Sequence, residues 1–389
     1  MNTQERWKPN LVRQNILFLE RSLDRESPLP SRERVRVRGR CAPWAPSPHS
    51  SPVKGEEVSK RRHVASELTL GILLILTVVF AAVPRVGSAA EGTRFLASYG
   101  GTAGYQLPLW VNKELGFSKK YGVDLEIILI QAGSPNIQAL LGGSLQLTQT
   151  AASSAVIGAT QGAPVVIVAT LENKLPMLLI SRPEIKEPQQ LRGKVIGINR
   201  FGGSNDAAVL MAIKAWKMEP KDISMLQTGG TAARMAALTS KKVDATVQSY
   251  PEIFQARKLG MNVLADIGDF GFYTNTSNIV TRAYLQQNRA AVKGFIKGQI
   301  EGMRYVKTNK EGSLRILRKH LQISDPEAVE GTYEFFAKRL PRSPRTELEG
   351  IKNILASIGA GQRNPAEYID MSLIDEIERE GFVKKLYGN

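Results

Sequence analysis

Residues 194–217 read KVIGINRFGGSNDAAVLMAIKAWK, and this stretch decides the fold. Its first six residues are mostly apolar and predict a strand over 194–199, whereas residues 205–217 have the spacing of a helix. The glycines at 202 and 203 form a turn of the kind that joins a strand to a helix. A strand that passes through a short turn into a helix is the repeating unit of α/β folds.

The same alternation runs through the chain on both sides of this stretch. Further strands are predicted at 93–98, 124–130, 145–149, 165–170, 177–181, 224–227 and 245–248. Further helices are predicted to begin near residue 105 and to cover 134–141, 153–160, 232–240 and 250–259. The β-branched run 165–170 is typical of a buried parallel strand, and the alternation as a whole predicts parallel sheets. After a short strand at 278–280, residues 284–389 are almost wholly helical in pattern.

Four glycine-bearing turns lie between a predicted strand and a predicted helix. They are Gly100-Gly101-Thr102, Ala132-Gly133-Ser134-Pro135, Gly202-Gly203-Ser204-Asn205 and Gly229-Gly230-Thr231. Ser134 is expected to cap its helix, with Pro135 in the first turn. Exposed N–H groups and a partial positive charge make helix N-termini natural sites for carboxylate, sulfonate or phosphate groups. No turn has the Gly-Lys-Ser/Thr of a P-loop or a G-x-G-x-x-G fingerprint, and any α/β domain contains such turns singly. Four of them favour a ligand cleft.

A secretory signal peptide is predicted at residues 60–90. Lys60-Arg61-Arg62 is followed by the apolar run 68–83 and then by small residues, with cleavage expected after Ala89 or Ala90. The apolar run is shorter than the roughly 20 residues of a membrane-spanning helix. An uncleaved membrane anchor is the alternative. A lipoprotein signal is not predicted, because no acceptor cysteine follows the apolar run. The signal places the protein in the periplasm.

Residues 1–59 are rich in Arg, Pro and Ser and cannot bury a core. We expect this extension to be spurious or disordered, because translation from Val58 or Val64 would place the signal peptide at the N-terminus. The alternative is a basic tail that binds nucleic acid or membrane.

Composition excludes several functions once residues 1–90 are set aside. The chain has net charge +16, and residues 1–90 hold 15 of its 52 Lys and Arg and 8 of its 36 acidic residues, so the remainder keeps about +9. These charges are scattered and do not predict nucleic-acid binding. Cys41 is the one cysteine, and His320 is the one histidine beyond residue 63. No thiol chemistry, His/Cys metal cluster, cofactor or catalytic residue is therefore predicted, and His320 is expected to be a solvated helix residue.

The stretch GYQLPLWVNKELGFSKKYGVDLEI at 104–127 resembles the opening of the substrate-binding proteins of nitrate/sulfonate/taurine/bicarbonate (NitT/TauT, SsuA-like) ABC importers. The match continues through AGSPNIQALLGGSLQLTQTAASSAVIGATQGAPVVIVA, LRGKVIGINRFGGSNDAAVLMAIKAWKMEP and TGGTAARMAALTSKKVDATVQSYPE, and covers residues 93 to about 385. The motifs are loose singly, but their order and spacing are specific.

The resemblance implies a two-lobed α/β periplasmic binding protein of type II, with a helical C-terminal part. Lobe 1 would comprise 91–174 plus 276–389, and lobe 2 would comprise 175–275. Such a protein is a monomer that captures a small solute between its lobes, closes by hinge motion and delivers the solute to a permease in the inner membrane. It is not an enzyme.

Carried over residue by residue, the resemblance also implies a set of ligand-binding side chains. In lobe 1 these are Thr102, Tyr105, Gln106, Ser134, Ala152, Ser153 and Asn173. In lobe 2 they are Gly203, Ser204, Asn205, Arg234, Tyr250 and Glu252. Ser134 and Ser204 are favoured because each can cap a helix and donate to an anion, and Arg200 or Arg234 could supply a charge. The basic charge favours an anionic solute such as a sulfonate or nitrate.

Three alternatives remain open. The chain also resembles the fungal thiamine-pyrimidine synthases, which share this scaffold but depend on a cysteine cluster and a histidine. A menaquinone-pathway enzyme has the same fold, although a secretion signal argues against it. A membrane-anchored ligand sensor would need an uncleaved segment 68–83.

Overall fold

The stretch 194–217 forms the strand, turn and helix that its pattern predicts. In the computed structural model, which describes residues 92–388, strand β6 (Val195–Ile198) leads through a turn into helix α6 (Ser204–Ala215). Gly202 in this turn has φ 70°, a left-handed conformation that favours glycine. The described residues belong to one unit of the chain, Arg85–Asn389. The predicted extension at 1–59 and the predicted signal peptide at 60–90 lie outside them.

The first sheet holds five strands in the order β2-β1-β3-β10-β4. The bounds are β1 Thr93–Tyr99, β2 Val123–Leu129, β3 Leu147–Ala151, β4 Val165–Thr170 and β10 Thr276–Thr281. β1 pairs in parallel with β2 and β3, whereas β10 runs antiparallel to both β3 and β4.

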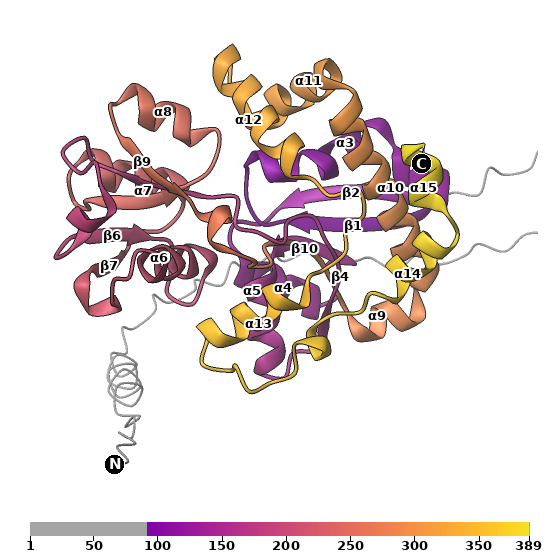
Figure 1. The fold of residues 1–389 in the computed structure, drawn as a ribbon. Coiled ribbons are helices and arrows are strands. Elements are labelled where there is room, and N and C mark those ends of the chain that lie inside the picture. The colour runs from indigo at the N-terminus through magenta and orange to yellow at the C-terminus, as the bar shows by residue number, and fades with distance from the viewer. Residues whose placement is uncertain (1–91, 389) are drawn as a thin grey trace, which may run out of the picture. The chain divides into compact units, whose positions relative to one another are not determined.

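The second sheet repeats this arrangement with the order β7-β6-β8-β5-β9. Its other strands are β5 Leu178–Ser181, β7 Ser224–Gln227, β8 Ala245–Gln248 and β9 Asn262–Asp266. β6 pairs in parallel with β7 and β8, and β5 is antiparallel to β8 and β9. Figure 1 shows β6, β7 and β9 with α6 to α8, apart from the first sheet.

Both sheets are therefore mixed, and the prediction of parallel sheets was wrong for one strand in each. β4 is fully buried, as its β-branched run predicts, but its partner β10 is antiparallel. The physical reason is connectivity: the chain leaves the first sheet after β4 and returns as β10, which inserts between β3 and β4. β9 was not predicted from the sequence.

The helices follow the βα rhythm and then continue without strands after β10. Those between strands are α3 Leu107–Leu115, α4 Gly133–Leu141, α5 Ala152–Thr160, α7 Thr231–Thr239 and α8 Glu252–Lys258. Those after β10 are α9 Arg282–Gln287, α10 Arg289–Thr308, α11 Lys310–Leu321, α12 Pro326–Arg339, α13 Leu348–Ser357, α14 Ser372–Arg379 and α15 Phe382–Tyr387. Short 3-10 turns include η2 (Gly104–Gln106) and η6 (Ile267–Phe270). Among residues 92–388 no helix is long and apolar enough to cross a membrane.

Helix α10 packs closely on α3 because glycines face the contact. A Cβ on Gly302 would lie 2.5 Å from the carbonyl oxygen of Pro108, and one on Gly298 would lie 2.7 Å from Asn112 Oδ1. Such distances leave no room for a side chain, so this approach requires glycine.

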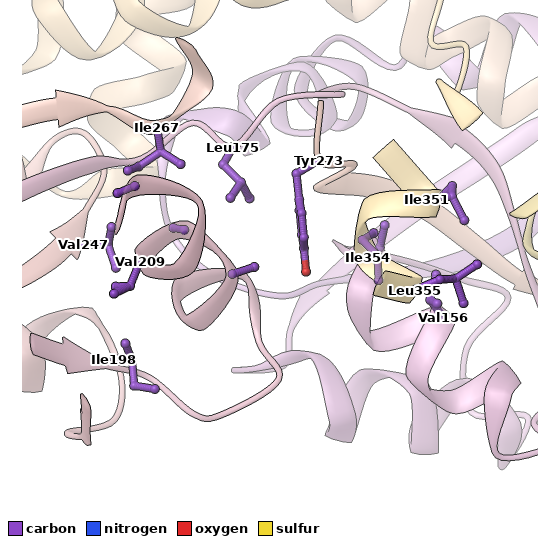
Figure 2. Close-up of a cluster of buried hydrophobic side chains, with 14 of the residues drawn as sticks. Val156, Leu175, Ile198, Val209, Val247, Ile267, Tyr273, Ile351, Ile354 and Leu355 are labelled. Carbon is purple, nitrogen blue, oxygen red and sulfur yellow. The ribbon is translucent and has the colours of Figure 1, made fainter. Parts of the chain in front are cut away.

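One hydrophobic cluster contains residues of both sheets. Figure 2 shows Tyr273, in the segment between β9 and β10, with Leu175 and Ile267 on one side and Ile354 of α13 on the other. Tyr273 is 1% exposed. The two halves of the described chain thus share buried apolar surface next to the segments that connect them.

Candidate ligand-binding site

Residues from the carboxyl ends of strands in both sheets line one cavity of about 740 Å³. Gly100 follows β1 and Thr150 lies at the end of β3, while Asn199 follows β6 and Gln248 ends β8. Ligands of open α/β sheets bind outside these ends. The cavity therefore lies where the fold favours a ligand.

All four glycine turns that the sequence singles out contribute to the cavity. The lining residues from these turns are Gly100, Gly101, Thr102, Ala132, Gly133, Gly203, Ser204, Asn205, Gly229, Gly230 and Thr231. Three of the turns open helices of nine or more residues, α4, α6 and α7, so N–H groups and partial positive charge are concentrated around the cavity. The turn before α4 needs its glycine, since a Cβ on Gly133 would lie 1.8 Å from Ser154 Oγ.

Most of the predicted site residues line the cavity. They are Thr102, Tyr105, Gln106, Ser153, Gly203, Ser204, Asn205, Arg234 and Glu252. Their part in binding remains a prediction.

The other four predicted residues lie elsewhere. Ser134 is exposed on α4. Ala152 is fully buried, although its sequence neighbours Ala151 and Ser153 line the cavity. Asn173 lines a separate cavity of about 460 Å³. Tyr250 packs against the ring of Phe335, with centroids 4.6 Å apart.

The predicted capping role of Ser134 and Ser204 was wrong. Ala132 and Gly203 occupy the cap positions, neither helix has a side-chain cap bond, and both serines lie within the first turn. Ser204 Oγ instead donates to Asn275 Oδ1 at 3.2 Å. The reason for Ser134 is that α4 begins at Gly133, two residues before the start that a Ser134 cap would give, because Ala132 with φ 70° takes the cap position.

Several cavity residues were missed by the sequence reasoning. They are Thr150, Ser154, Gln248, Ser249, Asn275 and Thr276. Each is a polar residue at or beside a strand or helix end, where an apolar run gives way to polar residues. That signal could have found them.

One wall of the cavity combines a buried arginine with a half-buried carboxylate. Arg234 is 6% exposed and donates to three acceptors: Val247 O at 3.1 Å, Gly229 O at 3.1 Å and Gln248 Oε1 at 3.3 Å. Desolvation lowers the pKa of Arg234 to about 10. Burial raises the pKa of Glu252 to about 7, although the charge of Arg234 acts against this.

Tyr105 belongs to the same wall. Burial raises the pKa of its hydroxyl above the ordinary range, and the negative charges of Glu172 and Glu252 add to the effect. Its ring makes an edge contact with Phe336 of α12, at 6.0 Å between centroids. Tyr105 is therefore a neutral hydroxyl at every physiological pH.

The other wall is formed by the N-termini of α5 and α6. Arg200 Nη2 lies 3.4 Å from Ser154 Oγ and so joins the loop after β6 to α5. Ser153 Oγ is buried and has no hydrogen-bond partner among residues 92–388, although Ser153 lines the cavity. A buried hydroxyl without a partner is costly, so this atom is suited to bind a ligand or water.

Two crossover segments connect the sheets beside the cavity. Their backbones pair, because Leu171 N donates to Thr276 O at 2.8 Å and Asn275 N donates to Glu172 O at 2.9 Å. Thr276 Oγ1 also donates to Glu172 Oε2 at 2.6 Å, and burial raises the pKa of Glu172 to about 7. The predicted lobe limits at 174/175 and 275/276 fall in these segments, and the division itself remains a prediction.

The model of the family described as "NMT1/THI5 like" matches residues 104–312, more than half of the chain. The chain belongs to the NMT1/THI5-like family.

Curated relatives of this NMT1/THI5-like chain are distant. A putative binding protein of Bacillus subtilis, YtlA, is 22% identical over 250 residues, which are 62% of this chain and 74% of the relative. The taurine-binding periplasmic protein of Escherichia coli is 25% identical over 190 residues, 48% of this chain and 58% of that protein. These relatives agree with the resemblance to the NitT/TauT, SsuA-like proteins, which is confirmed.

Solved structures confirm the fold. A protein from Bordetella bronchiseptica RB50 matches with TM-score 0.64 and 18% identity, over 77% of this chain and 99% of its own. The periplasmic aliphatic sulphonate binding protein SsuA from Escherichia coli matches with TM-score 0.60 and 18% identity, over 72% and 99%. The NMT1/THI5-like chain therefore has the two-lobed type II periplasmic binding protein fold that the resemblance predicts.

His320 does not belong to the cavity of this NMT1/THI5-like protein. Its ring stacks on Trp110, with centroids 4.7 Å apart, and its Nε2 lies 3.1 Å from Glu114 Oε1. The prediction of a solvated residue was wrong, because the side chain is only 16% exposed. Since none of these residues lines the cavity, His320 offers no catalytic base there.

Proposed function

We propose that this protein is an extracytoplasmic solute-binding protein. It captures a small anionic solute in the cavity between the two sheets and delivers it to the permease of an ABC importer. It acts in the periplasm as a monomer, after export directed by residues 60–90, and it catalyses no reaction.

The observation that carries the proposal is the composition of the cavity walls. Four glycine turns supply backbone N–H groups, Arg200 supplies a positive charge, and Ser153 supplies a buried hydroxyl without a partner. These groups come from both halves of the described chain, so a solute that touches both walls favours the arrangement in which the halves are close together. The likeness to binding proteins for sulfonate and taurine supports the same function.

A thermal-shift screen of the purified protein against sulfonates, carboxylates, nitrate and neutral heterocycles tests the proposal. A solute at a hundred times its dissociation constant adds about 2.7 kcal/mol to the free energy of unfolding. Arg200→Ala should weaken binding of the stabilising anion by about 10- to 100-fold, since hydrogen bonds to charged groups contribute about 1.5–3 kcal/mol. Arg315→Ala, on the exposed face of α11, is the matched control. Stabilisation by neutral heterocycles alone would refute the anionic solute.

A further inference from the structure

The carboxylate of Glu252 is unusual among the groups that line the cavity. It lies in the first turn of α8 and is half-buried, and no Lys or Arg of residues 92–388 forms an ion pair with it. Arg234 attracts it electrostatically, but the hydrogen bonds of that guanidinium go to carbonyl groups and to Gln248. Glu252 is thus a half-buried acceptor that lines the cavity, and such a carboxylate is stabilised most by a charged N–H donor.

The opposite wall has the reverse character. Arg200 reaches Ser154 and has no carboxylate partner among the described residues. Ser153, which precedes Ser154 in the sequence, adds its unpartnered hydroxyl. The N-termini of α5 and α6 add partial positive charge there. This wall suits an acidic group and would repel an amine.

The other residues that line the cavity indicate which kind of molecule could contact both Glu252 and the wall of Arg200. Tyr105 is the only aromatic side chain among the lining residues of the described chain, and Met177 is the only large aliphatic one. Binding sites for flat aromatic rings are lined mainly by apolar and aromatic side chains. Glycine, alanine, serine, threonine and amide side chains dominate here instead, so the walls suit a short, polar, aliphatic molecule.

We propose that the solute is an aliphatic zwitterion, with an acidic group on the wall of Arg200 and Ser153 and a protonated amino group on Glu252. This proposal rests on the proposed function of solute binding. Glu252 is then the residue that determines specificity, because it distinguishes an amino acid from the same acid without its amino group. A plain inorganic anion such as nitrate leaves Glu252 without a donor and binds weakly.

Matched pairs of small molecules test this selectivity. The pairs are 2-aminoethanesulfonate with ethanesulfonate, 3-aminopropanoate with propanoate, and 4-aminobutanoate with butanoate. Titration calorimetry of the purified protein should show, in at least one pair, that the amino compound binds about 10- to 100-fold more tightly than its partner. The sulfonate and carboxylate arms show which acid the Arg200 wall prefers.

Substitution of Glu252 supplies the second readout. Glu252→Gln should remove the preference for the amino compound over the plain acid, and Glu311→Gln on exposed α11 should leave that preference unchanged. Equal binding of both members of every pair, or an unchanged preference in Glu252→Gln, overturns the zwitterion while the solute-binding function stands. A protein that binds no member of any pair, and is stabilised by no anion in the thermal screen, overturns both.

Discussion

Glu172 makes the stability of this protein depend on pH in a way that one substitution should abolish. Its carboxylate is 5% exposed, lies in the first crossover segment and accepts a hydrogen bond from Thr276 Oγ1 of the second. Burial raises its pKa to about 7, from an ordinary value of 4.5, although the hydrogen bonds from Thr276 and Asn275 and the charge of Arg339 act in the opposite direction. Replacement by glutamine keeps an acceptor for Thr276 and removes the titration.

The size and sign follow from linkage. Below pH 4.5 both folded and unfolded chains hold the proton, so Glu172 contributes no pH dependence there. Between pH 4.5 and 7 the unfolded chain releases the proton and the folded chain retains it, so stability falls as pH rises. Above pH 7 the loss is complete and amounts to about 3 kcal/mol, since one pKa unit corresponds to about 1.36 kcal/mol.

Urea unfolding of the ligand-free protein at several values of pH between 4.5 and 8.5 measures this effect. Relative to Glu172→Gln, the wild-type protein should lose about 3 kcal/mol of stability over that range. Glu311→Gln, at an exposed position of α11, should follow the wild-type curve. Parallel curves for wild type and Glu172→Gln would show that the pKa of Glu172 is the same in the folded and unfolded chains, and the reasoning would fail.

Three further expectations concern Tyr273, Glu252 and Gly331. Tyr273→Ala should lower the free energy of unfolding by about 3–5 kcal/mol, because the ring of Tyr273 lies in the apolar cluster shared by both sheets (Figure 2). Tyr273→Phe keeps the ring and should lower it by less than about 1 kcal/mol. Denaturant titration measures both changes. Binding of an amino compound to Glu252, which Arg234 and Tyr105 face in the cavity, should weaken about tenfold per pH unit below pH 7. The reason is that the carboxylate, with its raised pKa, becomes protonated and neutral in this range. Calorimetry of Glu252→Gln should show no such dependence. Gly331→Leu should lower the melting temperature, since even a Cβ at this position would lie 2.1 Å from a ring carbon on α8, and a cost of about 1–3 kcal/mol is typical of overpacking.

The sequence predicts the local elements of this fold better than their pairing. Strands β7 and β8 have the predicted limits, because apolar runs between turn residues are local signals. The direction of β10 could not be predicted in this way, since it pairs with β4 only after more than one hundred intervening residues. β9 was missed because it is a short strand whose residues are all only half-buried, which leaves little alternation to recognise.

The same distinction applies to the candidate site. The glycine turns could be found because each marks a helix start within a few residues of sequence. Glu172 could not be found, since its burial and its bond to Thr276 arise only when the two crossover segments lie together. The prediction that Ser134 caps α4 was wrong for a geometric reason. Ala132 has a positive φ and takes the cap position, so α4 begins before Ser134.

Helix α12 shows that the mobile units of this protein need not follow the predicted lobes. By sequence α12 belongs to lobe 1, yet Phe336 lies in one buried cluster with Tyr250 of lobe 2, and Lys258 of α8 pairs with Asp325 just before α12. Exposing an aromatic side chain of this kind costs about 1.5–3 kcal/mol, so separation of the two helices during opening is unfavourable. We therefore expect α12 to move with α8. A double variant, Lys258→Cys with Asp325→Cys, joined by a short thiol cross-linker, should bind solute as tightly as the unlinked variant. Loss of binding on cross-linking would show instead that α12 and α8 separate when the protein opens and closes.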